Sequence, residues 1–170
     1  MLSPPPETAL LTQLDEILVS RWDFQTYVEF QITSKYLDLE SMVGQANVRI
    51  DLAAIHPVDA SIHFYEVESQ FHIQHPQLYR PFCDYCYVVC PSEQFDYLPT
   101  ETRDQQLQWA RDAGVGVVTI SKEGALHIRN RAQQQHMTVE IRQEVLRLME
   151  TRKSLQFPVQ PLWERSRQET

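Results

Sequence analysis

Residues 49–69 read RIDLAAIHPVDASIHFYEVES and contain two short apolar runs separated by a turn. The runs Val48–Ile55 and Ile62–Glu68 have the length and composition of β-strands, and HPVDAS between them is typical of a turn. Both runs nevertheless contain acids, with Asp51 in the first and Glu66 in the second. Because a buried carboxylate is costly unless something compensates its charge, these acids need a physical explanation.

The positions of the acids suggest that they meet. Side chains two positions apart on a strand share a face, so Asp51 should face the same way as Arg49 and Ala53. By the same rule, Glu66 and Glu68 share a face of the second strand. If the two strands pair as neighbours, three carboxylates come together, and a hard divalent cation such as Mg²⁺ or Mn²⁺ would compensate them. An ordinary solvent-facing strand is the alternative, because acid–x–acid patterns are common there.

The size and composition of the chain favour one globular domain. With 170 residues, of which 42% are hydrophobic, we expect a single domain at residues 1–152, followed by a loosely ordered or partner-dependent tail at 153–170. No apolar run is long enough to span a bilayer, and the N-terminus lacks the basic start of a secretory signal. Three cysteines, an odd number, favour reduced thiols and a cytoplasmic location.

The charge of the chain disfavours a nucleic-acid partner without excluding one. The formal net charge is −8, with 15 Lys and Arg residues against 23 Asp and Glu residues. Contacts to phosphates normally use basic side chains, so this balance is unfavourable. A local basic patch, or cations bound to the acids, would mask the negative charge at one site.

The remaining pattern predicts an α/β fold with a central mixed β-sheet flanked by helices in a three-layer core. Its first helix has Leu10, Leu14, Ile17 and Leu18 on one face. Two continuous apolar runs predict central strands that are covered on both faces. The further predicted elements are a helix at Glu7–Ser20, strands at Thr26–Thr33, Cys83–Cys90, Gly114–Ile120 and Gly124–Ile128, a helical turn at Gln70–Pro81, and helices at Thr100–Ala113 and Thr138–Thr151.

The arrangement Asp51…Glu66-Val67-Glu68 resembles the signature of the PD-(D/E)xK, or restriction-endonuclease-like, nuclease superfamily. That signature is an Asp followed by Glu-x-Lys, on a core of a helix, a three-strand meander, a helix and a further strand. The predicted order of elements fits, so the resemblance implies a restriction-endonuclease-like three-layer core. The stretch HPQLYRPFCDYCYVVCP is also similar to a segment of small bacterial members of this superfamily that are linked to DNA repair. In this resemblance four residues fall on family positions, namely Tyr79, Cys83, Asp84 and Pro91.

The resemblance implies a nuclease that hydrolyses phosphodiester bonds of DNA in repair or restriction-type processing, with Mg²⁺ or Mn²⁺ as its cofactor. It implies that Asp51, Glu66 and the backbone carbonyl of Val67 bind the metal. Glu68 would bind metal or position water, and Glu29 is the candidate for a further catalytic glutamate. The implied partner is nucleic acid, with a homodimer or a protein partner as further alternatives and no membrane.

One residue departs from the superfamily pattern. Glu68 occupies the position of the lysine that would orient or deprotonate the attacking water and stabilise the developing charge. Arg49 and Arg80 are the nearest cations that could substitute for it, and under the same resemblance Gln70 and Tyr79 are supporting residues. If nothing substitutes, the chain is a catalytically inactive PD-(D/E)xK-fold protein that acts as a protein-interaction module.

Cys83, Cys86 and Cys90 have a spacing that could suit zinc. A structural zinc site needs four converging ligands, and no second Cys/His pair follows at a suitable spacing. Cys86 and Cys90 also share a strand face within an apolar run, so we expect core packing.

Overall fold

The structure is a computed structural model, and it describes residues 6–71 and 75–156. The described residues form α-helices, one 3₁₀ helix and the strands of one sheet. In chain order these elements are α1 (Pro6–Ser20), β1 (Gln25–Ile32), α2 (Leu39–Val43), β2 (Val48–Ile55), β3 (Ile62–Val67), the 3₁₀ helix η1 (His75–Phe82), β4 (Tyr85–Pro91), α3 (Ser92–Asp96), α4 (Thr100–Ala113), β5 (Gly116–Ile120), β6 (Leu126–Asn130) and α5 (Val139–Gln156).

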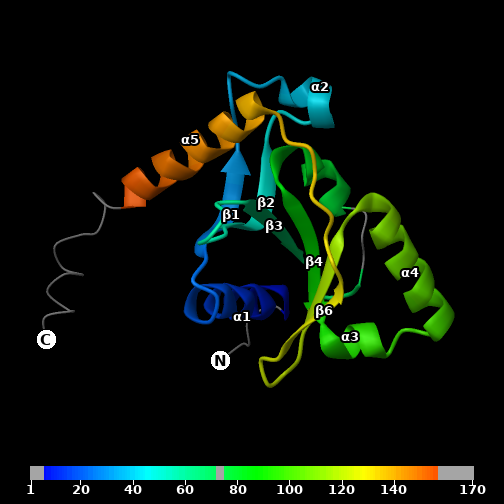
Figure 1. The fold of residues 1–170 in the computed structure, drawn as a ribbon. Coiled ribbons are helices and arrows are strands. Elements are labelled where there is room, and N and C mark those ends of the chain that lie inside the picture. Colours follow the sequence, from blue (N-terminus) through cyan, green and yellow to red (C-terminus); the bar gives the residue numbers. More distant parts are fainter. Residues whose placement is uncertain (1–5, 72–74, 157–170) are drawn as a thin grey trace, which may run out of the picture.

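The six strands in the described part of the chain form one mixed sheet in the sequential order β1-β2-β3-β4-β5-β6. β1, β2 and β3 make an antiparallel meander, β3, β4 and β5 run parallel, and β6 returns antiparallel to β5. Figure 1 shows the meander between α5 and α1, with α4 on the far side of the molecule from both. The predicted α/β fold with a central mixed sheet flanked by helices is therefore confirmed.

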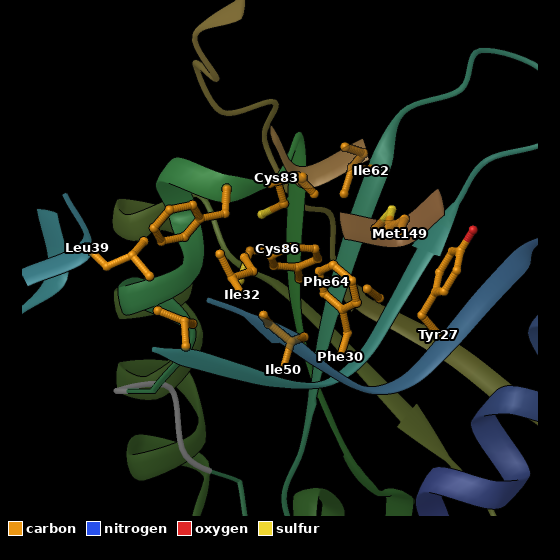
Figure 2. Close-up of a cluster of buried hydrophobic side chains, with 14 residues drawn as sticks. Tyr27, Phe30, Ile32, Leu39, Ile50, Ile62, Phe64, Cys83, Cys86 and Met149 are labelled. Carbon is orange, nitrogen blue, oxygen red and sulfur yellow. The ribbon is translucent and has the colours of Figure 1, made fainter. Parts of the chain in front are cut away.

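One face of the sheet is covered by α5, α2 and η1. Beneath them lies a core that joins Phe30 of β1, Ile50 of β2 and Phe64 of β3 to Met149 of α5 (Figure 2). Each of these four side chains is at most 1% exposed. Burial of such large apolar side chains is the main favourable contribution to folding.

The other face of the sheet is covered by α1. Its predicted apolar residues Leu10, Leu14, Ile17 and Leu18 are all buried, which confirms the helical periodicity. They pack with Tyr65 of β3 in a core cluster distinct from the one under α5. The residue before it, Phe64, belongs to the opposite cluster, as expected for a strand between two layers of helices.

The meander contains an irregularity that breaks this alternation. Glu29 has φ of 52°, in the left-handed region, and it lies in β1 at the level of Asp51. At the same level of β2, Ile50 and Ala53 belong to one core cluster, whereas Leu52 belongs to the opposite one. The predicted strict alternation, which placed Asp51 and Ala53 together and Ile50 on the other face, is therefore wrong across this point.

A buried acid fixes α5 to the start of the parallel strands. Asp84, which is 2% exposed, accepts a hydrogen bond of 2.8 Å from the backbone N–H of Ile62. Arg142 of α5 donates to both carboxylate oxygens of Asp84, and this charge compensation makes the burial tolerable.

Some element boundaries differ from the prediction. The final helix continues to Gln156, past its predicted end at Thr151 and past the boundary at residue 152, while residues 157–170 of the expected tail lie outside the described residues. Within the helical turn predicted at Gln70–Pro81, residues 72–74 lie outside the described residues and the 3₁₀ helix η1 begins at His75 and ends at Phe82. The short helices α2 and α3 have no clear periodicity in the sequence. In the described ranges, no helix has the length and apolar character that crossing a bilayer requires.

We predict that Phe64→Ala lowers the free energy of unfolding by about 3–5 kcal/mol, because it leaves a cavity between β3 and α5. Urea denaturation measures this change. Tyr97→Ala is the matched control: Tyr97 is 85% exposed, so its loss should change stability by no more than about 0.5 kcal/mol. A loss below about 1 kcal/mol for Phe64→Ala would contradict the described core.

Candidate metal centre

Two acidic side chains lie where the pairing of β2 and β3 ends. The antiparallel register runs from Ile55↔Ile62 to Leu52↔Tyr65. Beyond that pair, side chains take the place of backbone partners. The backbone N–H of Asp51 donates to Oε1 of Glu66 at 3.3 Å, and the N–H of Val67 donates to Oδ2 of Asp51 at 2.8 Å. Each carboxylate thus reaches across to the opposite strand, and the predicted approach of Asp51 to Glu66 is present.

The electrostatics of this pair are unfavourable without a proton or a cation. Glu66 is only 6% exposed, and its burial, followed by the charge of Asp51, raises its pKa to about 9. The charge of Glu68 contributes to this rise in pKa, whereas the hydrogen bond from the backbone of Asp51 opposes it. Glu66 therefore holds a proton at neutral pH unless a positive charge stabilises its ionised form.

Tyr79 of η1 completes the surroundings of Glu66. Its pKa is raised by burial first and by the charges of Glu66 and Asp51 next, and it shares a side-chain hydrogen bond with Glu66. The resemblance gave Tyr79 a supporting role, and its position beside Glu66 is consistent with that role. The hydroxyl stays protonated over the whole neutral range and can act as a donor at this site.

Asp51 lines a hollow of about 190 Å³ at the N-terminal end of α1. Glu29, Arg49 and Val67 also line it, and α1 contributes Glu7. Oε1 of Glu7 accepts a hydrogen bond of 3.3 Å from the backbone N–H of Ser69, so the helix end is attached to the chain just after β3. Sequence reasoning missed Glu7, because an acid in a first helical turn is usually explained by the helix dipole alone.

Glu29 and Arg49 pair with each other at the rim of this hollow. Nη2 of Arg49 lies 2.6 Å from Oε1 of Glu29, and both side chains are more than half exposed. Glu29 is thus near Asp51 but already has a cationic partner. Exposed pairs of this kind contribute little to stability and exchange partners readily.

The other predicted residues are distributed around the pair. Glu68 lies just beyond the end of β3, and its backbone N–H donates to the carbonyl of Val89 at 2.8 Å. Gln70 is exposed, with no described contact to the carboxylates. Arg80 donates from Nε to Oε1 of Gln135 at 3.0 Å, so its guanidinium is engaged away from Asp51 and Glu66.

The donor set fits a metal held by few protein ligands. Within residues 6–71 and 75–156, no group of three or more His, Cys, Asp or Glu side chains converges as a ready metal cage. Mg²⁺ keeps several waters and is often bound by only one or two carboxylates together with the phosphates of a substrate. Asp51 and Glu66 are two carboxyl groups of this kind, and metal binding by them stays a prediction, as does ligation by the carbonyl of Val67.

The three cysteines do not form part of this centre. Cys83, Cys86 and Cys90 are buried thiols rather than disulfides. Burial raises the pKa of Cys83 and, to about 12, that of Cys90. Cys83 and Cys86 lie in the core under α5 (Figure 2), which agrees with the expected packing role.

Comparison with known proteins supports the fold alone. No protein-family model and no curated protein matches the chain. Among solved structures, it is similar to SPO1766, a protein of unknown function from Silicibacter pomeroyi, with a TM-score of 0.61 and 17% identity over 92% of this chain and 91% of that one. A match to SSO0001 has a TM-score of 0.30 and 15% identity, over 88% of this chain and 59% of that one.

We predict that Glu66→Gln stabilises the metal-free protein increasingly as the pH rises from 5 to 8. The pKa of Glu66 rises from 4.5 to about 9 on folding, so its contribution to stability is complete below pH 4.5 and disappears as the pH rises toward 9. Glutamine carries no charge to bury and keeps the acceptor for the N–H of Asp51. At pH 8 with a chelator, we expect a melting temperature higher by at least about 3 °C.

Thermal denaturation at both pH values tests this prediction, with the exposed Glu123→Gln as the matched control. The control should not change the pH dependence. An equal loss of stability for Glu66→Gln at pH 5 and pH 8 would mean that the ionised carboxylate is needed by the fold itself.

Proposed function

We propose that this chain is a metal-dependent nuclease that hydrolyses phosphodiester bonds of DNA, of the PD-(D/E)xK type. The observation that carries the proposal is the pair of carboxyl groups of Asp51 and Glu66, which the chain brings together where the pairing of β2 and β3 ends. Among the described residues, no basic side chain is bonded to either carboxyl group, because Arg49 pairs with Glu29 and Arg80 with Gln135. The order of α1, the β1–β3 meander, η1 and β4 also agrees with the superfamily core.

In this proposal Asp51 and Glu66 hold Mg²⁺ or Mn²⁺, with the carbonyl of Val67 as a further ligand. The ion supplies a polarised phosphate oxygen and a bound water of lowered pKa. Glu68 orients that water, and Glu29 joins through a water at the rim. A cation held there would favour the ionised form of Glu66, because a nearby positive charge lowers the pKa of a carboxyl group.

Arg49 is the better placed substitute for the missing lysine. It lines the same hollow as Asp51, whereas Arg80 is bonded to Gln135. Arg49 would leave Glu29 and contact a substrate phosphate, which is a charge-assisted contact of greater strength than an exposed ion pair. The net charge of −8 makes such local cations necessary for any nucleic-acid substrate.

A second function is favoured by one specific observation. Asp51 and Glu66 each accept a backbone N–H, so both carboxyl groups have a structural use without any metal. The chain would then be a catalytically inactive protein of this fold that binds a protein partner through its acidic surface. For either function we propose a reducing, cytoplasmic location, in keeping with three buried thiols.

Mn²⁺ should raise the melting temperature of the wild-type protein by about 5–10 °C when its concentration is a hundred times the dissociation constant. Asp51→Asn removes a ligand charge and should abolish this shift, whereas Glu123→Gln should keep it. Thermal denaturation with and without Mn²⁺ measures the effect. No shift in the wild type would favour the interaction module.

Cleavage of supercoiled plasmid DNA with Mn²⁺ tests the reaction itself. Asp51→Asn and Glu66→Gln should each lower the rate at least about a hundredfold, and Arg49→Ala about tenfold or more, because charge stabilisation in the transition state is lost. Arg111→Ala, at an exposed position on α4, is the control for Arg49→Ala. Equal cleavage by wild type and Glu66→Gln would show a contaminating nuclease and contradict the proposal.

A further inference from the structure

A second hollow lies at the opposite end of α1 from the carboxyl pair. Its volume is about 190 Å³, and aromatic rings make up much of its lining. Trp22 and Phe24 reach it from the segment that follows α1, and His63, Tyr65 and Tyr87 reach it from β3 and β4. The proposed nuclease uses none of these residues, so the hollow needs a separate explanation.

His63 lies at the centre of these rings. It is nearly parallel to Tyr87, at 13° with centroids 5.8 Å apart, and Tyr87 is stacked on Tyr65 at 12° and 5.0 Å. Phe24 meets His63 edge to face, at 78° and 5.3 Å. The sheet therefore carries a row of nearly parallel rings along the hollow, with Trp22 at its rim 41% exposed. Such a row suits stacking with another flat ring.

The hydrogen bonds of His63 determine which of its ring nitrogens carries the proton. Ser61 donates its hydroxyl proton to Oδ1 of Asp59 at 2.7 Å. The same hydroxyl oxygen lies 2.9 Å from Nε2 of His63. Because Ser61 has only one proton to give, Nε2 must be the donor in this second bond. Nδ1 of the neutral ring is then a bare acceptor.

That acceptor is buried without a partner. His63 is 8% exposed, and among the described residues Nδ1 has no hydrogen-bonding group. Burial, followed by the charge of His56, lowers the pKa of His63 to about 4, so the ring is neutral at physiological pH. A buried acceptor of this kind is unfavourable until a donor reaches it. The neighbouring side chains that enclose it must move apart slightly for that to happen.

From these observations we propose that the hollow binds a flat, uncharged heteroaromatic molecule whose ring N–H donates to Nδ1 of His63. Its volume somewhat exceeds the roughly 150 Å³ of an apolar cavity that holds one benzene, so one ring or two fused rings fit. None of its described lining residues is Asp, Glu, Lys or Arg, so the site is built for a neutral ligand rather than an ion. Indoles and neutral nucleobases share this chemistry.

Calorimetric titration of the full chain with indole and with 1-methylindole tests the proposal at neutral pH. The two probes differ in the ring N–H, so indole should bind saturably with one site and about fivefold tighter than 1-methylindole. Trp22→Ala, at the rim, should weaken both probes at least about fivefold. Tyr97→Ala, remote from the hollow and 85% exposed, should leave both affinities unchanged.

His63→Phe is the decisive variant, because it keeps a ring and removes the acceptor. Binding of both probes with equal affinity to this variant would support the role of Nδ1. If His63→Phe does not fold, the comparison of the two probes on wild type and Trp22→Ala still decides. The proposal is overturned if the probes do not bind, if their binding does not saturate, or if the wild type binds both probes with equal affinity. It is also overturned if the wild type is a dimer that Trp22→Ala dissociates, because a second copy of the chain would then cover the hollow.

Discussion

The side chains of Asp51 and Glu66 close the gap where β2 and β3 separate, and much of the molecule's chemistry follows from this contact. Each acid accepts a backbone N–H across the gap, so neither can be removed without leaving a buried donor unsatisfied. The same geometry forces two like charges together in a partly desolvated place. Burial and repulsion raise the pKa of Glu66 to about 9, so Glu66 holds a proton at neutral pH unless a positive charge stabilises its ionised form.

Whether Glu66 binds a proton or a cation decides between the two proposed functions. When Glu66 is protonated, the two carboxyl groups accept backbone N–H groups at the end of β2 and β3, and the fold needs no metal. In the proposed metal-bound form the same oxygens would be ligands, and the hollow beneath the first turn of α1 would give access from solvent. Arg49, which is paired with Glu29 at the rim, lines that hollow. The proposed nuclease and the proposed interaction module differ in which form is used.

The sequence predicted the parts of this arrangement that depend on local patterns. The apolar spacing of α1 and the continuous apolar runs of β4 and β5 correspond to real elements, and the two turn-linked strands do bring Asp51 to Glu66. The phase shift at Glu29 was not predictable, because a left-handed φ at a glutamate leaves no compositional signal. The sequence also could not predict that Glu7 lies at this hollow or which ring nitrogen of His63 carries the proton, since both depend on contacts that form only in the folded chain.

The most direct test of the central claim is a titration of the Glu66 carboxyl by ¹³C NMR, assigned from the signal that Glu66→Gln removes. Without metal, the claim predicts a pKa near 9, and saturating Mg²⁺ should lower it by at least about two pH units. A pKa near the ordinary 4.5, or one that Mg²⁺ does not change, would contradict the account of two acids held together for a cation.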